Sequence, residues 1–73
     1  MGLDVSTGVY KARKRCGYTQ AEMGKELKVN ANTISSWERG KTQPSMEKIM
    51  KLSEVSGLSV DEILKYRDYH NVD

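Results

Sequence analysis

Apolar residues recur every three or four positions along most of this chain, which is the spacing of short amphipathic helices. The pattern predicts five helices, spanning about residues 6 or 7 to 15, 19 to 27, 30 to 39, 45 to 56, and 59 towards 67. No stretch alternates apolar and polar residues as a half-buried strand does. We therefore expect an all-α fold with five helices around one core.

The predicted helix ends carry residues that are typical of caps. Two helices begin with a capping box, formed by Thr19 with Glu22 and by Ser59 with Glu62. In a capping box, the side chain of each residue accepts a hydrogen bond from the backbone N–H of the other. Two further N-caps are expected, at Asn30 and Ser45. Glycines that can adopt positive φ follow three of the helices, at Gly17, Gly40 and Gly57.

The same spacing predicts which side chains face the core. Ile34, Trp37 and Glu38 lie at positions i, i+3 and i+4, so Trp37 is expected in the core and not at a base-stacking surface. Tyr10 is expected to be half exposed. The other inward residues are expected to be Val9, Ala12, Arg13, Cys16, Ala21, Met23, Gly24, Leu27, Met46, Ile49, Met50 and Leu52, and the fifth helix contains the apolar residues Val60, Ile63 and Leu64.

The length of 73 residues allows one domain, here divided into a lead over 1–6, a core over 7–67 and a flexible tail over 68–73. The single Cys excludes a disulfide within the chain, and no Cys/His spacing suits zinc, so neither metal nor cofactor is expected. No apolar run approaches the roughly 20 residues that span a bilayer. We expect a soluble cytoplasmic protein without a membrane partner.

The net charge of +2 is unevenly distributed. Residues 1–43 hold eight Lys or Arg against four Asp or Glu, which gives +4, whereas residues 44–73 hold four against six, which gives −2. A basic half fits a surface for a polyanion, although differences of this size are common.

Three motifs occur in order over most of the chain: RKRCGYTQAEM, TISSWERGKTQPS and GLSVDEIL. In sequence and spacing, the span from about Val9 to Leu64 resembles the phage-repressor/Cro type of helix-turn-helix domain. The resemblance implies a compact lambda-repressor-like fold in which the second and third helices form the helix-turn-helix. It also implies that the third helix enters the major groove of DNA.

The resemblance implies roles for particular residues. Positions at the start of the second helix, at the cap of the third and in the following loop match phosphate contacts: Thr19, Gln20, Asn30, Arg39, Lys41, Thr42 and Gln43. Positions on the third helix match contacts to base edges or the flanking backbone: Ala31, Asn32, Ser35 and Ser36. Arg13 and Glu38 match a partly buried ion pair that serves as structural glue.

The chemistry of the third helix supports these assignments. Asn32 is the first choice for a base contact, because an Asn amide can bond N6 and N7 of adenine together. Ser35 and Ser36 can donate or accept, and the methyl groups of Ala31 and Thr33 suit thymine. No Arg lies centrally on this face, so strong guanine recognition is not expected.

Two residues depart from the family pattern. Lys28 stands in the turn where Gly is usual, and a non-Gly residue at positive φ costs about 1 kcal/mol. Gly24 stands inside the second helix where Ala is usual, at a cost of about another 1 kcal/mol. Both substitutions are expected to weaken stability more than function.

The expected function is a sequence-specific double-stranded DNA-binding transcriptional regulator, a phage or bacterial repressor acting on a two-fold symmetric operator. A homodimer contact on DNA is expected from the fifth helix and tail, through Ile63, Leu64, Tyr66, Tyr69 and Val72. The alternative is an antitoxin or antagonist module that binds a protein through the same fold. An enzyme is not expected, because the sequence has one His, one Cys and no clustered carboxylates.

Overall fold

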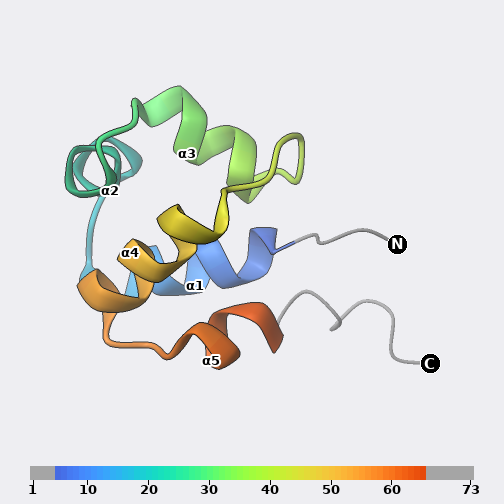
Figure 1. The fold of residues 1–73 in the computed structure, drawn as a ribbon. Helices are drawn as coiled ribbons and strands as arrows, with labels where there is room; N and C mark the ends of the chain where they lie inside the picture. The colour runs from blue at the N-terminus through green and yellow to red at the C-terminus, as the bar shows by residue number, and fades with distance from the viewer. Residues whose placement is uncertain (1–4, 66–73) are drawn as a thin grey trace.

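The structure is a computed structural model that describes residues 5–65, and this part of the chain forms five α-helices and no strand. The helices are α1 (Ser6–Cys16), α2 (Gln20–Leu27), α3 (Ala31–Glu38), α4 (Met46–Ser56) and α5 (Val60–Lys65) (Figure 1). The all-α fold class is thus confirmed. No helix within the described residues is both long and apolar enough to cross a membrane.

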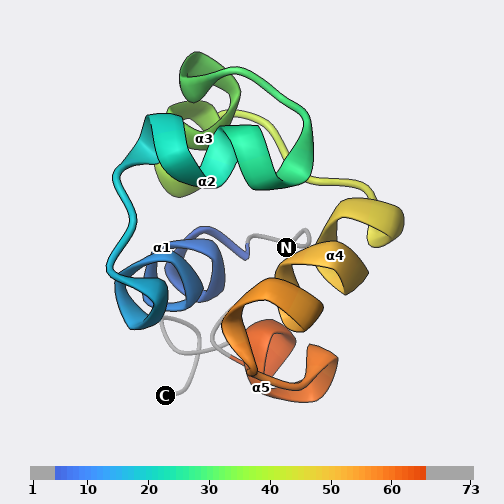
Figure 2. The same ribbon diagram turned by 90° about the vertical axis from the view of Figure 1, so that its left-hand side faces the viewer.

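The helices are arranged in three levels, with α3 and α5 at opposite ends of the molecule (Figure 2). The helix-turn-helix pair α2 and α3 lies over α1 and α4, and α5 lies beneath them. α1 contacts α3, α4 and α5, so it connects the helix-turn-helix pair to the rest of the fold. One side of α3 therefore packs against α2 and α1, and its opposite side faces away from the molecule.

All five helices contribute to one core. Its buried residues are Val5, Val9, Ala12, Met23, Leu27, Ile34, Trp37, Ile49, Leu52 and Ile63. The prediction that Ile34 and Trp37 face inward is confirmed. Val5 lies in the predicted N-terminal lead but is only 1% exposed, so the core begins before residue 7.

Three apolar residues that were predicted to face the core are exposed: Ala21, Met46 and Met50. The buried line of α4 is formed by Ile49, Leu52 and Ser56, at positions i, i+3 and i+7. Met50 lies beside this line and is 56% exposed, and Met46 in the first turn is 53% exposed. The apolar pattern of α4 is therefore wider than the strip that its neighbours cover, and the prediction of methionine core filler holds only for Met23.

The described part of α5 is held tightly against α1. The Cα of Gly8 approaches the backbone carbonyl of Ile63 so closely that a side chain at position 8 would collide with it. The side chain of Ile63 is fully buried, so the prediction that Ile63 offers spare surface for a dimer contact is wrong. Leu64 is half-buried. The predicted dimer residues Tyr66, Tyr69 and Val72 lie outside the described residues, as does the predicted tail.

The predicted helix caps are confirmed. Both capping boxes form, because Thr19 and Glu22 exchange side-chain bonds to each other's backbone N–H, as do Ser59 and Glu62. Asn30 and Ser45 accept the backbone N–H three residues ahead at the starts of α3 and α4. Positive φ angles occur at the three predicted glycines, Gly17, Gly40 and Gly57.

Both departures from the family pattern, Gly24 and Lys28, contribute to the turn between α2 and α3. Lys28 has a φ of 62°, and no other non-Gly residue within 5–65 has a positive φ. Val29 donates its N–H to the Gly24 carbonyl at 2.9 Å, and Lys28 donates to Lys25 at 3.4 Å, which is the bonding of a Schellman motif. A Cβ at Gly24 would lie 2.6 Å from the Val29 carbonyl oxygen. Gly24 thus allows the turn to fold back on α2, a packing role that helix propensity alone does not indicate.

Candidate nucleic-acid interface

The outer face of α3 carries the small polar side chains that the sequence predicted there. Asn32 is exposed, and the other four predicted base-contacting residues are half-buried: Ala31, Thr33, Ser35 and Ser36. Ile34 and Trp37 occupy the opposite side of the helix and fix its rotation through the core. The packing therefore turns short hydrogen-bonding groups and two methyl groups outward.

The start of α3 is held by one side chain. Asn30 accepts the Thr33 backbone N–H at 2.8 Å and the Thr33 hydroxyl at 3.1 Å, both through Oδ1. The Asn30 amide is thereby oriented with its oxygen towards the helix, and the Thr33 hydroxyl has a partner within the protein.

Behind α3, an ion pair joins three helices. Arg13 on α1 donates to the Glu38 carboxylate through Nε at 2.6 Å and Nη2 at 3.1 Å, and its Nη1 donates to the Tyr18 carbonyl at 2.8 Å. The hydrogen bond that Arg13 donates to Glu38 raises the pKa of Arg13. Gln20, the first residue of α2, donates Nε2 to the same carboxylate at 3.0 Å. The predicted Arg13–Glu38 pair is confirmed, and it ties the end of α3 to α1 and to the start of α2.

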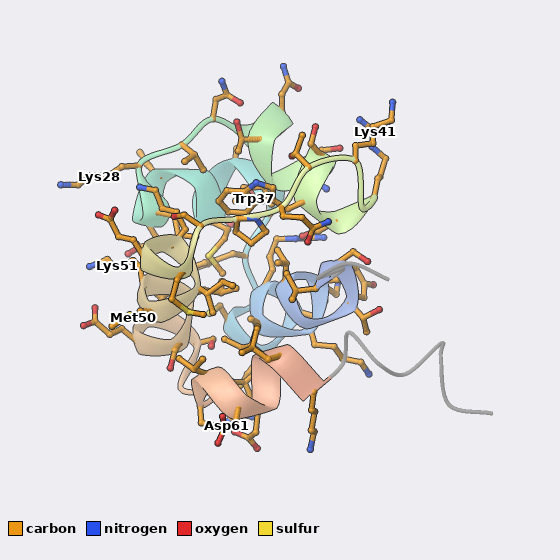
Figure 3. All side chains as sticks on the ribbon, turned by 45° about the vertical axis from the view of Figure 1, so that its right-hand side comes forward. Lys28, Trp37, Lys41, Met50, Lys51 and Asp61 are labelled. Atoms are coloured by element: carbon orange, nitrogen blue, oxygen red, sulfur yellow. The ribbon has the colours of Figure 1, made fainter. Side chains whose placement is uncertain are left out.

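The loop after α3 folds onto the end of that helix. Lys41 and Thr42 donate their backbone N–H groups to the Ser36 carbonyl, at 2.9 and 3.5 Å. Gln43 accepts the Val5 backbone N–H through Oε1 at 3.3 Å, which ties the loop to the start of α1. The predicted phosphate-contacting residues of the loop are all exposed: Arg39, Lys41, Thr42 and Gln43. Lys41 projects from the loop on the opposite side of the molecule from Lys28, Met50 and Lys51 (Figure 3).

The start of α2 supplies the remaining predicted phosphate contacts. Thr19 accepts the Glu22 N–H through Oγ1 at 3.1 Å, and its own N–H donates to the Glu22 carboxylate at 2.8 Å. Thr19 is exposed and Gln20 is half-buried. Since Gln20 bonds Glu38 at the end of α3, the start of α2 lies close to that helix. The fold thus brings the predicted base and phosphate residues onto α3 and its immediate surroundings.

Sequence reasoning missed the long-range bonds that orient this surface. The bond from Gln20 to Glu38 spans 18 residues, and the bond from Val5 to Gln43 spans 38. Lys48 donates Nζ to the Leu27 carbonyl at 2.8 Å and so supports the end of α2 from α4. No spacing in the sequence indicates such pairs, because they depend on how the helices pack.

Other candidate chemistry is sparse in the described part of the chain. Cys16 is half-buried, and its Sγ donates to the Val55 carbonyl at 3.6 Å. Burial raises the pKa of this thiol, which keeps it in the unreactive protonated form. No cluster of three or more His, Cys, Asp or Glu side chains within residues 5–65 has the geometry of a metal site.

Known proteins share this arrangement in sequence. A helix-turn-helix family model matches residues 9–63. The HTH-type transcriptional regulator ImmR of Bacillus subtilis is 35% identical over 54 residues, covering 74% of this chain and 42% of that protein. Repressor protein C2 of Salmonella phage P22 is 40% identical over 53 residues, covering 73% of this chain and 24% of that protein.

A third relative comes from another bacterium. The HTH-type transcriptional regulator DicA of Escherichia coli is 32% identical over 62 residues, which cover 85% of this chain and 46% of that protein. The chain spans less than half the length of each of these three relatives. No solved structure gives a significant match. The family match covers most of the chain and includes α2, the turn and α3, and this chain belongs to the helix-turn-helix family of the phage-repressor/Cro type.

Proposed function

We propose that this chain is the DNA-binding module of a transcriptional regulator, a repressor of phage or bacterial type, which inserts α3 into the major groove. The observation that carries the proposal is the outer face of α3, where short polar side chains surround the exposed Asn32. Large apolar side chains, which a protein-binding face would need, are absent from that face. The relatives that are named as regulators and repressors support the same function. The proposal includes no enzymatic activity.

In this proposal, α3 reads bases with short side chains. Asn32 bonds an adenine through N6 and N7, and Ser35 and Ser36 donate to or accept from neighbouring base edges. Ala31 and the Thr33 methyl meet thymine methyl groups, since the Thr33 hydroxyl is already bonded to Asn30. α3 itself contains no Arg or Lys, so the preferred site is expected to lack a strictly required guanine under α3.

The phosphate contacts come from both ends of α3. Thr19, Gln20 and Asn30 hold the backbone near the starts of α2 and α3, where free N–H groups also favour anions. The loop residues hold the backbone at the far end: Arg39, Lys41, Thr42 and Gln43. Such contacts fix the register of α3 on the duplex but do not read its sequence.

Two copies of the chain occupy one operator in this proposal. A single module of this size buries little surface on DNA, and half-sites for paired modules lie about one helical turn apart. Because Ile63 is buried, the contact between copies is left to Leu64 and to residues beyond 65, or to the duplex itself.

The test is the selection of bound sequences from a random duplex pool at about physiological salt. We expect a two-fold symmetric motif whose half-sites contain A·T pairs. Replacing Arg39 or Lys41 by Gln should weaken binding to every sequence about equally and leave the motif unchanged. If no motif emerged, the proposed function as a sequence-specific regulator would be contradicted. The exposed Met46 and Met50 on α4 would then be the first place to look for a protein partner.

A further inference from the structure

The first helix carries charge of one sign only. α1 contains Lys11, Arg13, Lys14 and Arg15 and no acidic residue. By contrast, α2, α4 and α5 each mix acidic and basic residues. A solvated helix face normally interleaves both signs. A surface of one positive sign attracts polyanions.

Two of these four cations are committed to the fold. Arg13 uses all three guanidinium nitrogens on Glu38 and the Tyr18 carbonyl. Arg15 donates Nε to the Ser56 carbonyl at 3.0 Å, at the end of α4. Lys14 is exposed, and within residues 5–65 it bonds neither a carboxylate nor a backbone carbonyl. Arg13 and Arg15 each bond a backbone carbonyl of the fold, whereas the ammonium of the exposed Lys14 lies over the Tyr10 ring.

An exposed aromatic ring lies beside Lys14. Tyr10 is 45% exposed, and it lies one helical turn before Lys14 on the same face of α1. The Lys14 Nζ lies 5.9 Å from the centre of the Tyr10 ring, and the Arg13 Cζ lies 5.5 Å from it. Both cations are within the range of a cation–π interaction with the negative face of the ring. Tyr10 and Lys14 together offer a phenol O–H and an ammonium group, which both donate to phosphate oxygens.

This pair is continuous with the proposed phosphate contacts. Tyr10 contacts Arg13, Arg13 bonds Glu38, and Glu38 accepts from Gln20 at the start of α2. Through Arg13 and Glu38, Tyr10 is thus connected to the start of α2, where Thr19 and Gln20 are proposed to hold the duplex backbone. Within residues 5–65, Glu38 is the acidic side chain that pairs with Arg13, and the charge of Glu38 is neutralised by that Arg.

We propose that Tyr10 and Lys14 form a further DNA-backbone contact, which binds a phosphate group adjacent to the one held by Thr19 and Gln20. This inference rests on the proposed function and extends the interface from α2 and α3 onto α1. The contact is independent of base sequence, because phosphate groups carry no sequence information. It adds affinity and leaves the choice of operator to α3.

The test compares Lys14→Gln with Lys51→Gln in the full chain. Both variants remove one positive charge, but Lys51 lies on α4, on the far side of the molecule from the loop that carries Lys41, and pairs with Glu54 at 3.5 Å (Figure 3). The probe is a random-sequence duplex, titrated between about 50 and 200 mM salt. If Lys14→Gln loses one phosphate contact, the plot of log K against log salt should become less steep by about 0.9. This change corresponds to about eightfold weaker binding near 0.1 M salt.

The tyrosine is tested by two variants. Tyr10→Phe removes only the hydroxyl and should weaken binding several-fold with the salt slope unchanged, whereas Tyr10→Ala should also weaken the hold on Lys14 and reduce the slope. Circular dichroism of each variant shows whether the helices remain formed. On a selected operator, all these variants should keep the wild-type ranking of base pairs.

The outcomes separate this inference from the proposed function. If Lys14→Gln and Lys51→Gln bind alike with equal salt slopes while the wild type binds duplex, the α1 contact is overturned and the proposed function stands. If Lys14→Gln has the reduced slope but no motif is selected, the α1 contact stands and sequence-specific regulation falls. A chain that binds no duplex at about 50 mM salt would overturn both.

Discussion

Replacing Gly24 by Ala is a decisive test of the helix-turn-helix packing, because helix propensity and packing predict opposite results. In a helix interior, Ala is more favourable than Gly by about 1 kcal/mol. In the structure, the new methyl group would lie 2.6 Å from the Val29 carbonyl oxygen and 3.2 Å from the Asn30 carbonyl carbon. Both atoms belong to the backbone of the turn. They cannot withdraw without displacing the Schellman motif or the start of α3.

The size of the effect follows from these two contributions. Overpacking typically costs about 1–3 kcal/mol, and contact with backbone atoms favours the upper part of that range. Subtracting the propensity gain of about 1 kcal/mol leaves a net loss of about 1–2 kcal/mol. For a domain of this size, each kcal/mol lowers Tm by about 4–8 °C. We therefore expect Gly24→Ala to lower Tm by roughly 4–16 °C.

The assay is thermal and urea unfolding followed by circular dichroism. Ala21→Gly is the matched control, because Ala21 is exposed in the same helix and reports helix propensity alone. We expect this control to lose about 1 kcal/mol. The reasoning is refuted if Gly24→Ala raises Tm by an amount that mirrors the loss in Ala21→Gly. That result would mean that the turn accommodates the methyl group without a loss of free energy of unfolding.

Three further predictions concern the turn, the ion pair and acid stability. Lys28→Gly should raise the free energy of unfolding by up to about 1 kcal/mol in urea titrations, since it relieves the positive φ; unchanged stability would contradict this. Arg13→Ala should lower the free energy of unfolding by about 3 kcal/mol in the same assay, because Glu38 is 8% exposed and would lose its charge partner. The double variant Arg13→Met with Glu38→Leu should recover most of this loss. The Ser59 N–H lowers the pKa of Glu62, so the stability that this carboxylate adds is present above about pH 4.3 and is lost as the pH falls through its lowered pKa. The Tm difference between the wild type and Glu62→Gln should narrow in melts below that pH, and a constant difference down to pH 3 would refute it.

Local chemistry made most of the fold predictable. Each capping box, N-cap and terminal glycine acts within three or four residues, so the sequence alone indicates where the helices begin and end. Burial was less predictable, because the width of the buried strip depends on neighbouring helices. Met46 and Met50 follow the apolar period of α4 but lie outside the strip that its neighbours cover. Ile63 was expected at a surface, yet α5 packs tightly against α1 and buries it.

The candidate site shows the same division. The residues of α3 could be assigned to inner and outer faces from their spacing, and the structure keeps those faces. The partners of Gln20, Gln43 and Thr33 were not predicted, since two of them lie far away in sequence. The packing role of Gly24 was not predicted, because helix propensity describes an isolated helix and this role depends on the backbone of the turn.

The central claim is that α3 reads base pairs through Asn32. The most direct measurement is the affinity of the wild type and Asn32→Ala for a selected operator and for duplexes altered at each single base pair. We expect the wild type to lose about 1–3 kcal/mol at the pair that Asn32 reads, and the variant to lose this preference there while it keeps the others. If Asn32→Ala discriminates at every position as the wild type does, α3 does not read DNA in the proposed way.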